Sequence, residues 1–218
     1  MQKRRQFLKT VFGSLIGMGI FFSPAFEMVR KAYAKAKIVI LPKDTSMETL
    51  VQKDPALLDT RNLAPTPLKN FRTMGDINYN ANINDWRLEV AGRVRTPLRL
   101  DYAEILTLST IERNVLLICQ GFFANHGRWK GISMGKLLEL AQMQTGVTHA
   151  TFSAPRGAGG NEATFPLADL ISDRVFLSYG VNSVTLPRKH GFPLRLVAEG
   201  YHGSVWVKYV NRIRLDNT

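Results

Sequence analysis

The residue best suited to chemistry is the only cysteine of the 218-residue chain, Cys119. It ends the apolar stretch RNVLLIC, residues 113–119, and a polar and aromatic loop is expected after it at residues 120–129. Candidate side chains of that loop are Asn125, His126, Arg128 and Trp129. A thiolate in such a place can bind a metal or attack a substrate, because loops that follow strands commonly carry functional groups. Packing in the core is the alternative, since a free cysteine is among the most buried residue types.

A second candidate site is basic and lies within residues 188–208. Its potential cations are Arg188, Lys189, His190, Arg195, His202 and Lys208. Such a cluster is typical of a cradle for a phosphate or another anion, and a solvated basic surface is the alternative. Arg195 lies between Leu194 and Leu196. A guanidinium buried in so apolar a strand needs an anionic or hydrogen-bonding partner.

Two other classes of function use the same residues. Cys119 with His126, His190 or His202 could form the pair of a thiol hydrolase, although no local protease motif accompanies them. A periplasmic module that binds an anion or a cofactor without redox activity would need only the basic cluster.

The composition limits the classes of ligand and the kinds of site that the chain can have. Lys and Arg total 29 against 17 Asp and Glu, a formal net charge of +12, which suits an anionic ligand, a membrane surface or nucleic acid. Nucleic acid fits poorly, because the aromatic residues do not alternate with the basic ones as a base-stacking platform requires. A single cysteine excludes a disulfide framework and any zinc site built from several thiolates. The 45% hydrophobic and 21% charged residues are typical of a soluble globular chain.

Short strands and short helices must position these residues. Asp101 with Glu104 predicts the start of a helix that runs to about Leu108, Ser133 caps a second helix, and a third follows Pro166. Strands are expected at 86–94, 113–119, 150–153, 175–179, 193–198 and 205–215, with a glycine-rich loop at 156–160. Because no βαβ unit repeats, this order favours an α+β fold with a mixed or barrel-like sheet.

The N-terminus is typical of an export signal. Adjacent Arg4 and Arg5, followed by an uncharged and largely apolar stretch at 10–26, resemble a twin-arginine signal except that Lys3 precedes the pair. Ala-x-Ala sites at 32–34 and 34–36 allow cleavage, and the stretch is near the lower length of a membrane span, so an uncleaved anchor is the alternative. We therefore expect a periplasmic protein with three parts: a signal or anchor at 1–36, an extended wrapping segment at 37–70, and a functional domain at 71–218.

Three stretches together resemble the molybdopterin-binding domain of the sulfite oxidase family. They are Cys119 with GRWKGISMGKLLELA behind it, HGFPLR at 190–195, and WVKYV at 206–210. The similarity runs from about Phe71 to the C-terminus. It implies the mixed-sheet fold of that family and a molybdenum–molybdopterin cofactor, in the plain rather than the nucleotide-extended form. It also implies an oxidoreductase that performs oxygen-atom transfer or a related two-electron reaction.

The resemblance implies a role for each matching residue. Cys119 would be the thiolate ligand of molybdenum, which suits a soft ligand and a thiophilic metal. Residues 71–73 match the early cofactor-contacting loop of the periplasmic methionine sulfoxide reductases within this family, with Asn70 just before it. The implied cofactor contacts are Asn70, Phe71, Arg72, Thr73, Cys119, Ala154, His190, Arg195, Trp206, Val207 and Lys208, with a backbone contact alone at Ala154.

The residues after the cysteine depart from the sulfite-oxidising members of the family. Those members carry an arginine there, whereas this chain reads GFFANHG at 121–127, so we expect a less charged substrate than sulfite. It would enter past Phe122, Phe123, Asn125 and His126, with Asn125 and His126 as catalytic candidates beside Cys119. We expect His126 to donate a proton or a hydrogen bond, with a purely structural histidine as the alternative. Tyr201 and His202 are weaker candidates for the mouth of the site.

The resemblance also implies partners. The short exported members of the family exchange electrons with a separate haem protein in the membrane, so we expect such a protein, the twin-arginine export machinery and a small-molecule substrate as partners. A basic surface could orient the chain on anionic lipid or on the haem protein.

Overall fold

The computed structural model describes residues 38–217 of the chain. The predicted export signal and its cleavage sites therefore lie outside the described residues. From Ile40 onward the chain forms one compact unit. Within residues 38–217 no helix is long and apolar enough to cross a membrane.

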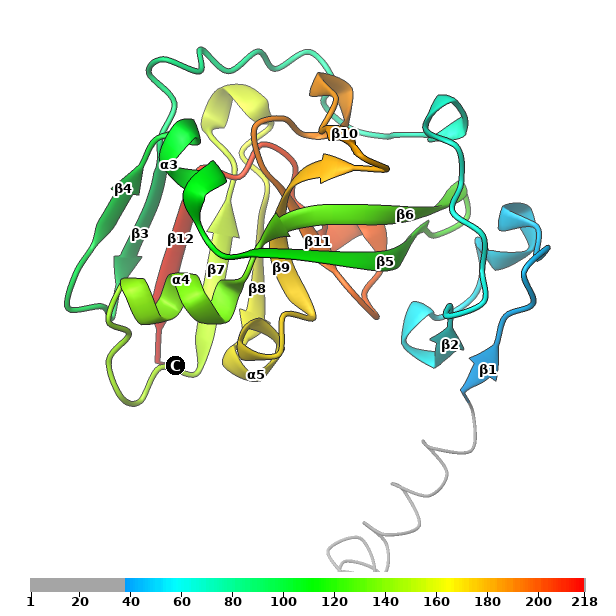
Figure 1. Ribbon diagram of the computed structural model, residues 1–218, viewed down its shortest axis with the longest axis horizontal. Coiled ribbons are helices and arrows are strands. Elements are labelled where there is room, and N and C mark those ends of the chain that lie inside the picture. Colours follow the sequence, from blue (N-terminus) through cyan, green and yellow to red (C-terminus); the bar gives the residue numbers. More distant parts are fainter. Residues whose placement is uncertain (1–37, 218) are drawn as a thin grey trace, which may run out of the picture. The chain divides into compact units, whose positions relative to one another are not determined.

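Two five-stranded sheets form the framework of this unit, and their strands cross (Figure 1). The first sheet has the order β10–β9–β6–β5, with β11 also paired to β9, and all its pairs are antiparallel. Its strands are β5 (Thr110–Cys119), β6 (Phe123–Ile132), β9 (Val175–Val181), β10 (Val184–Thr185) and β11 (Arg195–Ala198).

The second sheet has the order β4–β3–β12–β7–β8. Its strands are β3 (Leu88–Gly92), β4 (Leu98–Leu100), β7 (His149–Ser153), β8 (Glu162–Pro166) and β12 (Arg212–Asp216). The pair β12–β3 is parallel and the other pairs are antiparallel, so this sheet is mixed. The expected α+β class with a mixed sheet is confirmed.

Short helices connect the strands. The α-helices are α3 (Tyr102–Thr107), α4 (Met134–Leu140) and α5 (Leu167–Ile171). Asp101 and Glu104 form the predicted capping box of α3, in which each side chain accepts a hydrogen bond from the other residue's backbone N–H. Ser133 caps α4 by accepting from the backbone N–H of Lys136 at 3.3 Å. Helix α4 buries Met134, Leu137 and Leu138 and packs against α5 and β9.

Single 3-10 turns occupy much of the remaining chain. They are η1 (Met47–Leu50), η2 (Pro55–Leu57), η3 (Leu68–Asn70), η4 (Arg156–Ala158), η5 (Arg188–His190) and η6 (Gly203–Val205). Between residues 39 and 70 the only regular pairing among the described residues is the two-stranded sheet of β1 (Val39–Ile40) and β2 (Leu58–Asp59).

The hairpin of β5 and β6 separates two hydrophobic cores. Val115 and Leu117 of β5 belong to the main core, whereas Leu116 and Ile118 pack with Leu41, Leu50 and Leu63 in a smaller one. Successive side chains of a strand point to opposite faces, so one hairpin serves both cores. The segment before residue 70 thus covers one face of the hairpin.

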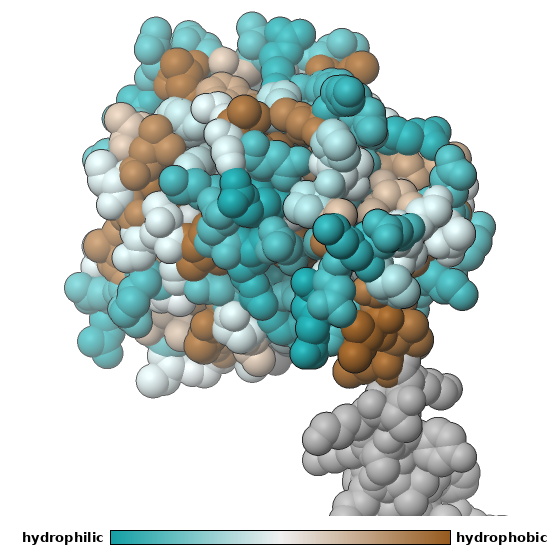
Figure 2. Space-filling view, turned by 45° about the vertical axis from the view of Figure 1, so that its right-hand side comes forward, coloured by the Kyte–Doolittle hydropathy of each residue, from teal (hydrophilic) through white to brown (hydrophobic). Residues whose placement is uncertain are grey.

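The outer surface is mostly polar. Figure 2 shows a face on which hydrophilic residues predominate and apolar residues form small groups. A run of exposed apolar side chains occurs at Ile38, Val39 and Ile40, each between 53% and 56% exposed.

Two expectations about the strands are wrong. Residues 123–129 belong to β6 rather than to a loop. Its polar side chains are buried by segments far away in the chain, His126 by Ala64 and Thr66 and Asn125, on the opposite face, by Arg72. The expected strand at 205–215 is limited to β12, since η6 and Tyr209 interrupt the extended backbone, the latter with a φ of 60°. The short strands β4 and β8 were not expected from the sequence.

Candidate active site

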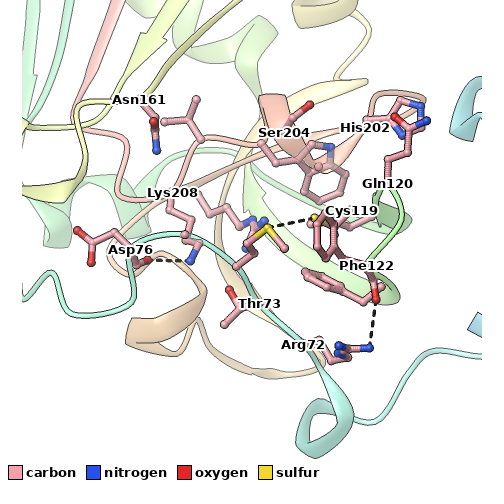
Figure 3. A pocket seen from close by; sticks show the side chains of 18 of the residues that line it. Arg72, Thr73, Asp76, Cys119, Gln120, Phe122, Asn161, His202, Ser204 and Lys208 are labelled. Carbon is pink, nitrogen blue, oxygen red and sulfur yellow. Dashed lines mark hydrogen bonds between the residues drawn. The ribbon is translucent and has the colours of Figure 1, made fainter. Parts of the chain in front are cut away.

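The turn that joins β5 to β6 places Cys119 in the wall of a cavity of about 360 Å³ (Figure 3). The lining residues come from segments far apart in the chain: 72–76, 117–123, 158–161, Arg195 and 202–209. The polar and sulfur-containing ones are Arg72, Thr73, Met74, Asp76, Cys119, Gln120, Asn161, Arg195, His202, Ser204, Lys208 and Tyr209. Asp76 is the only acidic residue among them, so the cavity favours an anionic ligand.

The Cys119 thiol is partly exposed to this cavity. Its Sγ lies 3.9 Å from Sδ of Met74, whose side chain also lines the cavity and is 46% exposed. Partial burial raises the pKa of the Cys119 thiol, and the charge of Arg195 offsets part of that rise. Without a ligand the thiol is therefore protonated at neutral pH, and a bound cation would be needed to hold it as a thiolate.

Arg195 lies at the back of the cavity with 6% of its surface exposed. Its guanidinium carbon is 5.6 Å from the ring of Trp129 and 5.6 Å from the ring of Trp206, so two indoles flank the cation. Nη1 donates to the backbone oxygen of His190 at 3.1 Å, and Nε has no hydrogen-bond partner among the described residues. Burial lowers the pKa of Arg195 to about 10, which still leaves it charged at neutral pH.

Lys208 lies on the same wall and is held by two backbone oxygens. Its Nζ donates to Asp76 at 2.8 Å and to Lys189 at 3.2 Å. Burial, followed by the charge of Arg195, lowers the pKa of Lys208 to about 8. Gly191 packs closely against both cations and leaves little room for a side chain, because a Cβ there would lie 3.1 Å from Cβ of Arg195 and 3.2 Å from Cβ of Lys208.

His190 stands behind this cationic wall rather than in the lining of the cavity. It is 1% exposed, and its ring meets the ring of Phe71 edge-on with the centroids 5.8 Å apart. Burial, then the charges of Arg195, Lys189 and Lys208, lower the pKa of His190 to about 4. It is therefore neutral at pH 7, and its buried Nε2 has no hydrogen-bond partner among the described residues.

The loop at 71–73 is fixed by Asn125. The amide oxygen of Asn125 accepts from the backbone N–H of Arg72 at 3.1 Å, and its Nδ2 donates to the backbone oxygen of Arg72 at 2.8 Å. The Arg72 side chain lies over the ring of Phe123, and its Nη1 donates to the backbone oxygen of Phe122 at 3.1 Å. Thr73 donates from its hydroxyl to the backbone oxygen of Lys189 at 3.3 Å, which joins this loop to η5.

The structure brings most of the expected residues together, but not all. Arg72, Thr73, Cys119, Arg195, His202, Trp206, Val207 and Lys208 line the cavity. Phe71, His190 and Ala154 are buried and Asn70 is exposed, and none of these four is part of its lining. Tyr201 donates to Oδ2 of Asp169 at 2.5 Å and likewise does not line the cavity.

Asn125 and His126 occupy opposite faces of β6, and neither lines the cavity. Asn125 lies across from Leu117 and His126 across from Leu116, which belong to different cores. His126 is fully buried, and its Nδ1 lies 3.2 Å from the backbone oxygen of Ala64. The pleat therefore directs His126 away from Cys119. His126 therefore does not line a substrate path to Cys119, contrary to the expectation from the sequence. Asn125 does not line one either and is hydrogen-bonded to the loop at 71–73.

Several residues that line the cavity were not expected from the sequence. Met74, Asp76, Asn161, Ser204 and Tyr209 line the cavity; of these only Tyr209 lies within a motif, WVKYV, and it was not among the expected site residues. Asp76 and Tyr209 carry one signal in the sequence, since each lies close to a residue that the resemblance selected. Asn161 lies between the glycine-rich loop and β8, and its backbone oxygen accepts from the N–H of Ala154 at 2.9 Å.

Comparisons with known proteins decide the class of this site. Residues 74–218 match the family described as "Oxidoreductase molybdopterin binding domain". The chain belongs to this family. By its description this family is a molybdopterin-binding domain of oxidoreductases, as the resemblance in the sequence implied.

Relatives within the family differ in their named substrates. The chain is 32% identical to the protein-methionine-sulfoxide reductase catalytic subunit MsrP of Gluconobacter oxydans over 145 residues, which cover 60% of this chain and 46% of that protein. It is 29% identical to the NADH nitrate reductase of Lotus japonicus over 189 residues, which cover 73% of this chain and 21% of that protein. This chain thus spans between about a fifth and a half of the length of these relatives.

A solved structure shares the fold. The crystal structure of the sulfane dehydrogenase SoxCD from Paracoccus pantotrophus superimposes with a TM-score of 0.60 at 23% sequence identity. The match covers 64% of this chain and 40% of that chain.

The residues of the cavity fit a molybdopterin cofactor. Two polar atoms of lining residues, Arg195 Nε and His202 Nδ1, are buried and have no partner among the described residues, which is costly unless a ligand supplies hydrogen bonds. Arg195 and Lys208 supply the positive charge that a terminal phosphate requires. Cys119 supplies a soft sulfur ligand in the same cavity, and no cluster of three or more His, Cys, Asp or Glu competes for a metal within residues 38–217.

Proposed function

We propose that the chain is an exported molybdoenzyme in which Cys119 is the protein ligand of a single molybdenum centre. The observation that carries this proposal is the position of Cys119: its thiol faces the same cavity as the buried Arg195 and the partly buried Lys208. Arg195 and Lys208 can hold a phosphate, and Cys119 can hold a thiophilic metal. When bound, the cofactor supplies oxygen-atom transfer coupled to the movement of two electrons.

The chain itself binds and orients the cofactor. Arg195 and Lys208 would hold its phosphate, with Trp206 and Val207 beside it and His190 behind it. Neutral His190 can offer its Nε2 as a hydrogen-bond donor or acceptor, because its lowered pKa removes the positive charge at neutral pH. Asn125 would hold residues 71–73 against the cofactor, with Asn70 just outside, and Ala154 would contribute through its backbone.

We propose an organic sulfoxide as the substrate class. Phe122 and Phe123 line the cavity next to Cys119 and give that side an apolar surface, which suits a neutral substrate better than sulfite. The named substrate of the MsrP relative supports the same class. The reaction is R₂S=O + 2 H⁺ + 2 e⁻ → R₂S + H₂O, in which sulfur is reduced and the S–O bond breaks.

The thiol-hydrolase alternative finds no support at Cys119. Within the described residues its thiol contacts the Met74 thioether, and no histidine is hydrogen-bonded to it. The alternative of a binding module without redox activity predicts a bound anion without molybdenum.

The test of the proposed function is the variant Cys119→Ser in protein expressed with its own export signal. We expect the wild type to contain about one molybdenum and one pterin per chain and to reduce dimethyl sulfoxide with reduced viologen as electron donor. Loss of the thiolate should abolish turnover and most of the molybdenum, while the thermal unfolding of the cofactor-free chain changes little, because the hydroxyl is nearly isosteric. Full activity in Cys119→Ser would refute the ligand assignment, and turnover of nitrate but not of sulfoxides would refute the substrate class.

Export by the twin-arginine route, a periplasmic location and a separate haem protein as electron partner are parts of the same proposal. They rest on residues 1–36 and on the short exported members that the chain resembles. The three-part division into 1–36, 37–70 and 71–218 belongs to it as well, and the packing of Leu41, Leu50 and Leu63 on one face of the β5–β6 hairpin supports it.

A further inference from the structure

A second cavity, of about 280 Å³, lies beside the cofactor pocket. The two cavities share Arg72, Phe122 and Phe123 as lining residues. The second one also receives Met47 and Val51 from the segment that precedes the functional domain. No role in the proposed reaction accounts for this cavity.

The turn after Cys119 forms the partition between the two cavities. The backbone N–H of Phe122 donates to the backbone oxygen of Cys119 at 2.9 Å, which closes the turn. The N–H of Gly121 donates to the backbone oxygen of Val51 at 2.9 Å, which holds the turn against the wall of the second cavity. Phe122 is 58% exposed and contributes to both cavities. A substrate whose reacting atom lies near Cys119 can therefore extend past Phe122 into the second cavity.

Apart from Arg72, whose Nη1 donates to the backbone oxygen of Phe122 at 3.1 Å, the lining of the second cavity suits an uncharged group. Met47, Val51, Phe122, Phe123 and Ala124 offer apolar surface. Two hydroxyl groups of the lining are already used within the chain. The Ser46 hydroxyl accepts from the N–H of Glu48 at 3.4 Å, and the Thr66 hydroxyl accepts from the N–H of His126 at 3.0 Å. Glu48 and Asn70 are exposed, so their polar ends remain hydrated.

We propose that the second cavity is the subsite for the alkyl or aryl group attached to the reacting sulfur atom. This inference rests on the proposed function, and it deepens it by stating which sulfoxides the enzyme prefers. Burial of apolar surface there favours substrates with a chain of several carbon atoms over dimethyl sulfoxide. The segment at 46–51 thus sets specificity although it lies outside the family match, which begins at residue 74.

The test is a series of methyl n-alkyl sulfoxides, from methyl to hexyl, reduced by the holoenzyme. We expect kcat/KM to rise roughly fourfold for each added methylene until the cavity is full, and then to level off. Val51→Phe fills the cavity and should reduce the ratio of kcat/KM for the hexyl and the methyl substrate at least tenfold. Met47→Ala enlarges the cavity and should move the plateau to longer chains. Val184→Phe is the matched control, because Val184 is exposed on β10 and lines neither cavity.

A binding measurement separates this inference from the proposed reaction. Calorimetry with methyl hexyl sulfone and dimethyl sulfone needs no turnover, and the hexyl compound should bind more tightly to the wild type than to Val51→Phe. If no sulfoxide is reduced but this difference is present, the proposed reaction fails and the subsite stands. If kcat/KM and sulfone binding are both independent of chain length, or if Val51→Phe responds to chain length as the wild type does while unfolding at the same temperature, the subsite is refuted.

Discussion

At the scale of single residues, burial lowers the pKa values of three basic side chains at one cavity, Arg195, Lys208 and His190, to different extents. Arg195 is buried but keeps its charge, because two indole rings and the backbone oxygen of His190 replace part of its hydration. Lys208 is less securely charged, since its pKa is about 8. His190 is neutral. The cavity lining therefore carries the guanidinium groups of Arg72 and Arg195, and the ammonium group of Lys208, which titrates just above neutral pH.

This difference predicts how anion binding depends on pH. An ammonium group is present below its pKa and lost above it, so the cofactor-free protein should bind sulfate more weakly as the pH rises through about 8. Between pH 7 and pH 9 the affinity should fall roughly threefold to tenfold, because most of the Lys208 charge disappears over that interval. Sulfate is a suitable probe, since its own charge is constant over this range.

Calorimetric titrations at both pH values check this prediction, with Lys208→Arg as the control. Arginine keeps its charge at pH 9, so that variant should show a much smaller decrease in affinity. An equally steep decrease in Lys208→Arg would assign the titration to another group.

A second prediction at this scale concerns Asn125. Asn125→Leu leaves the backbone N–H and oxygen of Arg72 without their partner, which should cost about 1–3 kcal/mol of unfolding free energy and loosen residues 71–73. Asn125→Asp keeps the acceptor but loses the donor, so its unfolding free energy should lie between those of the wild type and Asn125→Leu. Pterin retained per chain after gel filtration measures the effect on the site, and denaturant unfolding measures the effect on stability. Full pterin retention in Asn125→Leu would show that this loop is not needed to hold the cofactor.

At the scale of elements, the β5–β6 hairpin has two roles: β5 ends at Cys119, and the side chains of β5 pack into both hydrophobic cores. Strand β6 pairs with β9 through an irregularity between Lys130 and Gly131. Gly131 has no room for a side chain, since a Cβ there would lie 2.0 Å from the backbone oxygen of Leu177. The close approach of the two strands thus depends on this glycine.

Gly131→Ala should therefore destabilise the protein. We expect a loss of about 1–3 kcal/mol or more in unfolding free energy, because backbone has to move to make room. Gly157→Ala is the matched control, since nothing lies within 4 Å of the added Cβ there, and it should be close to neutral. Chemical denaturation of the two variants gives the comparison, and equal stabilities would contradict the tight approach of β6 and β9.

The elements also show how far the sequence predicts the structure. Local signals suffice for the capping box at Asp101 and Glu104 and for the buried strand that ends at Cys119, because both depend on residues close in the chain. The expected loop at 120–129 is largely strand β6, since the burial of His126 comes from Ala64 and Thr66, some sixty residues away. Arg195 and Lys208 were expected from the basic cluster at 188–208, and the family resemblance then assigned them to the cofactor. The positions of Met74 and Asn161 in the cavity depend on tertiary packing that no local pattern encodes.

At the scale of the whole molecule, the chain spans only part of its relatives, so partners and export have to be tested directly. The net charge of +12 suits attachment to anionic lipid or to an acidic electron partner. The replacement of Arg4 and Arg5 by Lys should retain the protein in the cytoplasm, since the adjacent arginines are the part of the motif that defines the export route.

Cell fractionation with antibody detection tests this prediction. Lys69→Arg serves as the control for a conservative change of charge outside the signal and should leave the distribution unchanged. Periplasmic protein at wild-type level in the Arg4→Lys, Arg5→Lys variant would exclude the twin-arginine route.

The pair of indoles around Arg195 has an optical consequence. Two of the three tryptophans, Trp129 and Trp206, flank the same cation, whereas Trp86 packs against Tyr102. A pterin placed against Trp206 would absorb the near-ultraviolet emission of these indoles, so insertion of the cofactor would dim the intrinsic fluorescence of the protein. The chain thus carries its own reporter of loading, readable without a label and before any substrate is known.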